Sequence, residues 1–308
     1  MIKRGYILML FLTMLAGTVF GQNSGKLTYD SYELYRNGEY KKAAELIDRA
    51  IAETEDSISV ESWYLRAGIY WGIFNKIDLK SELSDARVVS LISVLEAVEL
   101  DLDQIYYQQS LVLLEKISTS YYNDAVSATI NFNIDNPKFA ENSYLEYKRI
   151  QKILYPDKNF DEMDVSFYKA EATSFAKAYQ VDPSKNKDLF YLTIEALGKV
   201  LKIDSNDYGA NYNTAIYYYN EGVYQIETID TQTDITELII IQKYSSDRFQ
   251  EAMPYMLKAN EIRTREETLR GLVGIYNVIY DEEKVEYYRA ELEKLKEVNF
   301  GNENAPDK

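Results

Sequence analysis

The sequence predicts an all-α protein built from antiparallel helix hairpins, and three observations support that class. The 308 residues include only five prolines and 13 glycines, too few for the many turns of an all-β fold. The chain is 46% apolar and 27% charged, which is ordinary for a folded domain. In several separate segments, small and large residues recur at the spacing of one helical face.

A small–large–small pattern at relative positions 0, +4 and +7 is the clearest of these repeats. Offsets of four and seven lie on one side of a helix, so two small residues let a neighbouring helix approach and the large residue fills the gap. A fifth segment has Glu171 in the first slot, followed by Phe175 and Ala178. The four full matches are Ala43/Ile47/Ala50, Ser90/Val94/Ala97, Thr193/Leu197/Val200 and Ala252/Met256/Ala259.

A second pattern precedes some of these segments, with a small or medium residue at +4 and an aromatic residue at +7. It occurs in "WYLRAGIY" (63–70), "NYNTAIYY" (211–218) and "LRGLVGIY" (269–276). The alternation of the two patterns resembles the tetratricopeptide repeat, which has W-x2-L-G-x2-Y on helix A and A-x3-F-x2-A on helix B. Trp63, Ala67 and Tyr70 match the helix A signature well.

The resemblance implies a right-handed antiparallel helix-hairpin solenoid over residues 22–300, with irregular helices in the middle. "VLKID" begins only 22 residues after the start of "AYQVD", which leaves room for one helix where the family places two. Residues 104–160 are expected to be helical but do not follow the repeat. The polar segment "GNENAPDK" (301–308) is expected to be a disordered tail.

The first twenty-one residues have the features of a secretory signal peptide. Lys3 and Arg4 precede an apolar run, and the small residues Val19 and Gly21 suit positions −3 and −1 of a cleavage site. We therefore predict cleavage before Gln22 and a periplasmic or secreted protein, with no membrane insertion after cleavage. An uncleaved anchor is the alternative, although the apolar run is short for a span of about 20 residues.

Composition argues against most catalytic chemistry. The chain contains neither cysteine nor histidine, which excludes disulfides, thiolate nucleophiles, Ser–His pairs and the common zinc sites. "DSNDYG" (204–209) starts like a calcium loop, but Ala215 occupies the twelfth position and Asp207 is better placed to cap a helix. We therefore expect no enzyme activity, no metal site and no cofactor. A net charge of −16 also argues against binding to nucleic acid.

The resemblance implies a function in binding a protein or peptide partner, because one face of each helix A lines a concave groove in the family. Within the stretch "NYNTAIYYYNEG", Tyr218 is expected to fill a buried packing slot and Tyr219 to be partly exposed. The chain has 29 tyrosines, which also suits an alternative, an outer-membrane-associated glycan-binding protein of the starch-utilisation type. The groove candidates are Tyr64, Trp71, Tyr212, Tyr219, Arg270 and Asn277.

Overall fold

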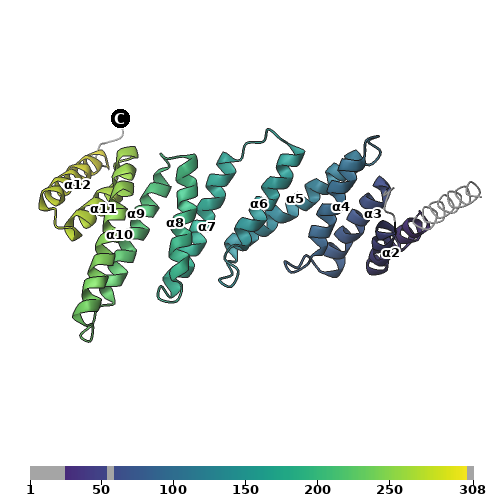
Figure 1. Ribbon diagram of the computed structural model, residues 1–308. Coiled ribbons are helices and arrows are strands. Elements are labelled where there is room, and N and C mark those ends of the chain that lie inside the picture. The colour runs from purple at the N-terminus through teal and green to yellow at the C-terminus, as the bar shows by residue number, and fades with distance from the viewer. Residues whose placement is uncertain (1–24, 54–58, 304–308) are drawn as a thin grey trace, which may run out of the picture. The chain divides into compact units, whose positions relative to one another are not determined.

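The computed structural model describes residues 25–53 and 59–303, with side chains described up to residue 297 (Figure 1). The predicted signal peptide, residues 1–21, lies outside this part of the chain, as do residues 304–308 of the predicted tail. Over the described ranges every regular element is helical and no strand occurs. The last helix extends to Glu303, so the first three residues of the expected tail are helical.

Residues 25–36 are helical, and eleven longer helices and one short π-helical segment follow in the described part of the chain. Ser59, Asp207 and Asp234 each accept a hydrogen bond from a backbone N–H in the first turn of the helix that follows, so Asp207 is the cap that the sequence predicts. The elements are α2 (Tyr40–Ala52), α3 (Val60–Gly72), η1 (Ile73–Ile77), α4 (Ala86–Leu100), α5 (Tyr107–Ile130), α6 (Phe139–Leu154), α7 (Asp161–Val181), α8 (Lys187–Ile203), α9 (Tyr208–Glu227), α10 (Ile235–Ile262), α11 (Glu266–Val278) and α12 (Glu282–Glu303).

The helices form two compact units. Unit 1 comprises the chain as far as Asp124 together with Ser143–Lys158, and unit 2 comprises Ala125–Asn142 and the chain from Asn159 onward. The long helices α5 and α6 therefore each contribute residues to both units.

Consecutive helices pack as hairpins inside each unit. In unit 1 the helix 25–36 joins α2 through a hydrogen bond from Ser31 Oγ to the carbonyl of Ala43 (2.8 Å), and α3 joins α4 through one from Ser90 Oγ to the carbonyl of Ala67 (2.8 Å). In unit 2 the hairpins are α7 with α8, α9 with α10 and α11 with α12. The predicted all-α helix-hairpin class is confirmed.

This pairing explains the spacing that did not fit the repeat. The segment "AYQV" ends α7 and "VLKI" ends α8, so the two similar endings belong to the two arms of one hairpin. Only one helix is needed between them. Residues 104–160 contain α5 and α6, and Gln151 of α6 donates to Ser118 of α5 (3.0 Å) inside unit 1.

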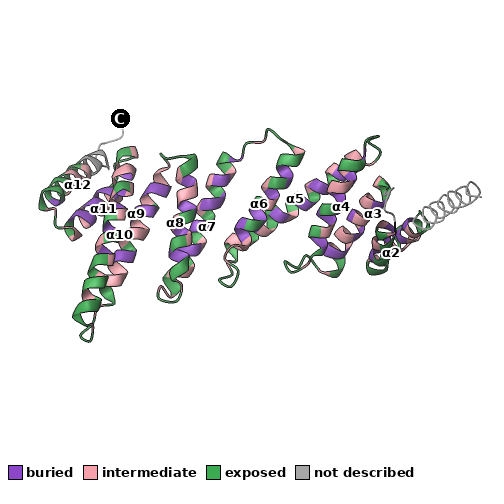
Figure 2. Cartoon of the chain, in the orientation of Figure 1, coloured by how far each residue is buried: buried purple, intermediate pink, exposed green. Residues whose placement is uncertain are grey.

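The four full small–large–small matches form contact surfaces on the second helix of four hairpins, α2, α4, α8 and α10, whereas the fifth segment, around Phe175, lies on α7, the first helix of its hairpin. None of the twelve side chains in the four full matches exposes more than 2% of its surface. Helix α6 has the same arrangement at Ser143, Tyr147 and Ile150, all buried, which the sequence pattern missed because its last two residues are both large. Figure 2 shows the buried positions along the faces where helices meet. No helix in the described ranges is both long and apolar enough to cross a bilayer.

Candidate functional site

The end of helix α3 has an irregular backbone that shapes a pocket in unit 1. The α-helix continues into the π-helical turn η1, where the N–H of Asp78 bonds to the carbonyl of Ile73 (3.0 Å). Leu79 and Lys80 then adopt left-handed φ angles of 50° and 63°, which non-glycine residues seldom occupy. π-Helical turns and such strained residues concentrate at functional sites, so this segment is the first place to look for one.

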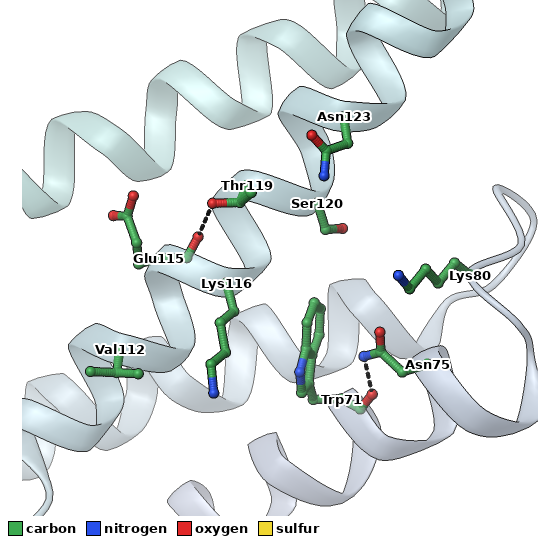
Figure 3. Close-up of a pocket in the computed structure, with 9 residues that line it drawn as sticks. All are labelled: Trp71, Asn75, Lys80, Val112, Glu115, Lys116, Thr119, Ser120 and Asn123. Carbon is green, nitrogen blue, oxygen red and sulfur yellow. Dashed lines mark hydrogen bonds between the residues drawn. The ribbon is translucent and has the colours of Figure 1, made fainter.

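The pocket lies between this segment and helix α5 and has a volume of about 400 Å³. We call it the Trp71 pocket, after the one predicted groove residue that lines it (Figure 3). The nitrogen of the Asn75 side chain donates to the carbonyl of Trp71 (2.7 Å), which fixes the amide beside the indole. The lining residues are Trp71, Asn75, Lys80, Val112, Glu115, Lys116, Thr119, Ser120 and Asn123.

Several polar groups of the pocket are already used by the protein. Glu115 accepts two hydrogen bonds from the amide of Gln151 (3.2 and 3.1 Å), and the Thr119 hydroxyl donates to the carbonyl of Glu115 (2.8 Å). Ser120 Oγ accepts a bond from the buried guanidinium of Arg87 (2.8 Å). These bonds hold the wall formed by α5 in one arrangement.

Other polar groups of the pocket have no protein partner. Among the described residues, Lys80 and Lys116 form no ion pair, and the side-chain amide of Asn123 makes no hydrogen bond. Both lysines are exposed, so their ammonium groups are accessible to a ligand. The pocket can therefore offer hydrogen-bond donors and positive charge to a ligand beside an aromatic ring.

Tyr64, the other candidate on α3, lies outside this pocket. Its ring stacks on that of Tyr106 with centroids 5.1 Å apart, and burial raises the pKa of the Tyr64 hydroxyl. Tyr64 thus packs against the segment that precedes α5.

The two tyrosine candidates on α9 pack inside unit 2. Tyr212 stacks on Tyr208 with centroids 6.0 Å apart and nearly parallel planes. Tyr219 lies 5.4 Å from the ring of Phe249, and its hydroxyl oxygen is 3.2 Å from the position that a Cβ at Gly274 would occupy. Helices α10 and α11 therefore both contact the ring of Tyr219.

The predicted contrast between Tyr218 and Tyr219 holds only in part, because Tyr219 is partly exposed as expected but Tyr218 is partly exposed as well. Both rings are half-buried and both pack against the same core cluster of α9, α10 and α11. Tyr218 contacts Phe190 (5.8 Å) and Tyr255 (6.2 Å between centroids), so it is not the fully buried packing residue that we expected. The physical reason is that Gly222 and Gly274 let neighbouring helices close on adjacent faces of α9.

Arg270 and Asn277, the candidates on α11, are exposed. Arg270 pairs with Glu266 one turn earlier on its own helix (2.5 Å). Of the six predicted residues, Trp71 alone lines the Trp71 pocket, and no pattern in the sequence marked Asn75, Lys80, Lys116 or Asn123.

Unit 2 also contains two fully buried acidic side chains with different surroundings. Glu221 accepts hydrogen bonds from the hydroxyls of Tyr179 and Tyr244, the latter at 3.0 Å. Glu171, by contrast, has an Oε1 atom with no hydrogen-bond partner among the described residues. Burial, with a further contribution from the charge of Glu141, raises the pKa of Glu171 to about 8, so this carboxyl is protonated at neutral pH.

Metal-ligating side chains do not gather near these groups in the part of the chain that the structure describes. Within the ranges described, no cluster of three or more His, Cys, Asp or Glu residues could hold a metal ion. The arrangement at Trp71 is suited to binding, since it combines an aromatic ring with fixed and unpaired polar groups.

Comparison with known proteins adds little to this geometry. No protein-family model and no curated protein matches the sequence. Among solved structures, the S. pombe nuclear import adaptor Nro1 aligns over 94% of this chain and 95% of its own, with 14% identity and a TM-score of 0.32. Similarity at that level supports no conclusion about function. The fold itself defines the class, an all-α protein of helix-hairpin repeats.

Proposed function

We propose that the protein is a non-catalytic scaffold that binds a protein or peptide partner, and that its hairpins are divergent tetratricopeptide-like repeats. The burial of the repeated small–large–small positions on α2, α4, α8 and α10 supports the repeat assignment. The observation that best supports the binding function is the Trp71 pocket, which combines an indole with unpaired hydrogen-bond donors.

The chemistry of the pocket fits a peptide. A pocket of a few hundred Å³ with an aromatic wall and a few polar groups is typical of ligand sites. A peptide segment supplies backbone carbonyls for the amide of Asn123, and an acidic side chain or terminus for Lys80 and Lys116. Its apolar side chains can pack against Trp71 and Val112.

Glycan binding is the second candidate, and one feature favours it. Asn75 lies beside the indole of Trp71, and Ser120 and Asn123 line the same pocket from α5 (Figure 3). Sugar hydroxyls require both donors and acceptors, which amides and hydroxyls provide. In that case the lysines would not contribute to affinity for a neutral glycan.

We also propose that the protein is exported and is periplasmic or secreted. The proposal is based on the residues around Lys3, Arg4, Val19 and Gly21. Mass analysis of material from the native host tests it. A mature chain that begins at Gln22 supports export, and retention of residues 1–21 contradicts cleavage.

A display library of random dodecapeptides tests the binding function. Peptides are selected for binding to the wild type, and those that also bind the Trp71→Ala variant are removed. The peptides that remain are those that require the pocket. We expect enriched sequences whose affinity falls at least tenfold with Trp71→Ala, with an unchanged helical circular dichroism spectrum. No enrichment, together with binding on a glycan array that Trp71→Ala abolishes, would replace the peptide function by the glycan alternative.

A further inference from the structure

The α9–α10 hairpin has an outer end that no other helix of unit 2 covers. Helix α10 has 28 residues, about 42 Å, whereas α8 has 17. Its buried residues begin only at Ser245, and α9 has none after Gly222. Figure 1 shows this end reaching past the loop of the neighbouring α7–α8 hairpin. Tyr244 contacts Lys187 of α8, so we define the α10 arm as residues 226–243.

The α10 arm exposes more aliphatic surface than its own folding requires. Leu238 and Ile241 are half-buried, whereas Ile235, Ile239 and Ile240 are 69%, 58% and 63% exposed. The three isoleucines spread over one broad side of α10, together with Thr236 and the aliphatic stem of Lys243. Scattered apolar residues are normal on a surface, but a contiguous group at the end of a projecting hairpin is characteristic of an interaction site.

The charges of the α10 arm restrict what can cover this side. Glu227, Asp230, Asp234 and Glu237 are acidic, and Lys243 is the one basic residue. Glu227 and Glu237 form no ion pair within the described residues. An apolar face with an acidic rim is complementary to an apolar groove with a basic rim.

The acidic charges of the arm argue against a second copy of this chain and against a membrane surface as the partner of this side. A second copy would bring two identical acidic rims together, and like charges facing each other oppose association. An anionic membrane would meet Asp230 and Asp234 first, at the tip of the arm. Neither is favoured by charge.

We propose that the α10 arm is a second docking element, separate from the Trp71 pocket, which inserts Ile235, Ile239 and Ile240 into an apolar, basic-rimmed groove of a partner protein. The proposal does not depend on the scaffold function assigned to the pocket. In addition to a pocket that binds a ligand, the protein would then have an exposed element that is itself bound by another protein.

A model ligand of defined chemistry tests the proposal. The probe is a 14-residue amphipathic peptide with leucine on one face and lysine on the other, bound to the fluorescence-labelled protein in 150 mM salt. We expect the Kd to rise at least tenfold for the variant Ile235→Ser/Ile239→Ser/Ile240→Ser. A matched control at three exposed isoleucines elsewhere, Ile92→Ser/Ile153→Ser/Ile203→Ser, should leave the Kd within twofold.

The rim is tested separately with Glu227→Gln/Glu237→Gln, which should raise the Kd three- to tenfold and weaken its salt dependence. Equal affinity of the wild type and the arm variant would overturn the proposal. A wild-type dimer that the arm variant converts to monomer, measured by sedimentation, would overturn it in favour of self-association. Binding to phosphatidylcholine–phosphatidylglycerol vesicles that the arm variant abolishes would overturn it in favour of a lipid surface.

Discussion

The Trp71 pocket of unit 1 and the tyrosine-rich interior of unit 2 arise from similar sequence patterns, but the first is an open pocket and the second is closely packed. In both, a helix carries aromatic residues at the positions expected to line a groove. Beside Trp71, helix α5 presents Val112, Lys116 and Thr119, and space remains. Beside Tyr219, helix α11 presents Gly274, and the backbone closes on the ring.

The comparison shows that the neighbouring helix decides whether an aromatic residue becomes a surface or a packing contact. A glycine removes the side chain that would keep two helices apart, so their aromatic residues fill the remaining space. Beside Trp71 the facing residues of α5 carry side chains, and a pocket remains between the two elements. The polar groups differ too: Lys80 and Lys116 of the pocket are exposed, whereas the unpartnered oxygen of Glu171 is buried inside unit 2.

The largest expected effect is on the free energy of unfolding and comes from the buried carboxyl of Glu171. Because the folded pKa of Glu171 is about 8, above the ordinary value of 4.5, the folded state holds the proton more tightly than the unfolded chain. This stabilisation is complete below pH 4.5 and is lost as pH rises to 8, a change on the order of 4 kcal/mol.

The isosteric variant Glu171→Gln removes this dependence. We expect it to match the wild type near pH 4.5 and to exceed its free energy of unfolding by several kcal/mol at pH 9, measured by urea denaturation. Glu227→Gln, at an exposed position on α9, is the control for loss of one negative charge. A stability difference that does not change with pH would mean that Glu171 is ionised in the folded state.

The next effect tests the packing of α9. Emptying a fully buried aromatic site costs about 3–5 kcal/mol, so two half-buried rings should each cost roughly 2 kcal/mol. We expect Tyr218→Ala and Tyr219→Ala to be equal within 1 kcal/mol in denaturant melts. A much smaller loss at Tyr219 would restore the groove position that the repeat pattern predicts.

Close helix approach in unit 2 predicts a smaller effect with opposite signs at two glycines. A Cβ at Gly222 would lie 2.6 Å from Cε1 of the buried Phe249, so Gly222→Ala should destabilise by about 1–2 kcal/mol. Gly198 lies in helix α8 with no atom within 4 Å of its Cβ position, so Gly198→Ala should stabilise by about 0.5–1 kcal/mol. Thermal melts compare the two variants, and destabilisation at both would mean that α8 is also tightly packed there.

The smallest effect on stability is expected in the Trp71 pocket. Lys80→Gln and Lys116→Gln remove unpaired charges, so each should change the free energy of unfolding by less than about 0.5 kcal/mol. The peptides selected on the wild type should nevertheless bind at least tenfold more weakly to the double variant, measured by fluorescence anisotropy. Unchanged affinity would mean that the peptide contacts the indole without using the two ammonium groups.

Much of the architecture was determined by the sequence itself. The helical class follows from few helix breakers and a repeated helical face, because both act through local backbone geometry. Ala43, Ile47 and Ala50 are buried as their spacing predicts, and Asp207 caps α9 because its side chain reaches an N–H only three residues away. Such contacts need no knowledge of distant residues.

Only the tertiary structure decided the rest. The pairing of α7 with α8 makes one hairpin from segments whose similar endings suggested a missing helix. The left-handed Leu79 and Lys80 have no sequence signature, since neither is a glycine, and the π-helical turn Ile73–Ile77 continues α3 without a break in the helical pattern. The fate of each tyrosine depends on which residue the next helix places against it. The residues that pack against a tyrosine lie far from it in the sequence. A helical period describes the faces of one helix only, so it cannot identify those partners.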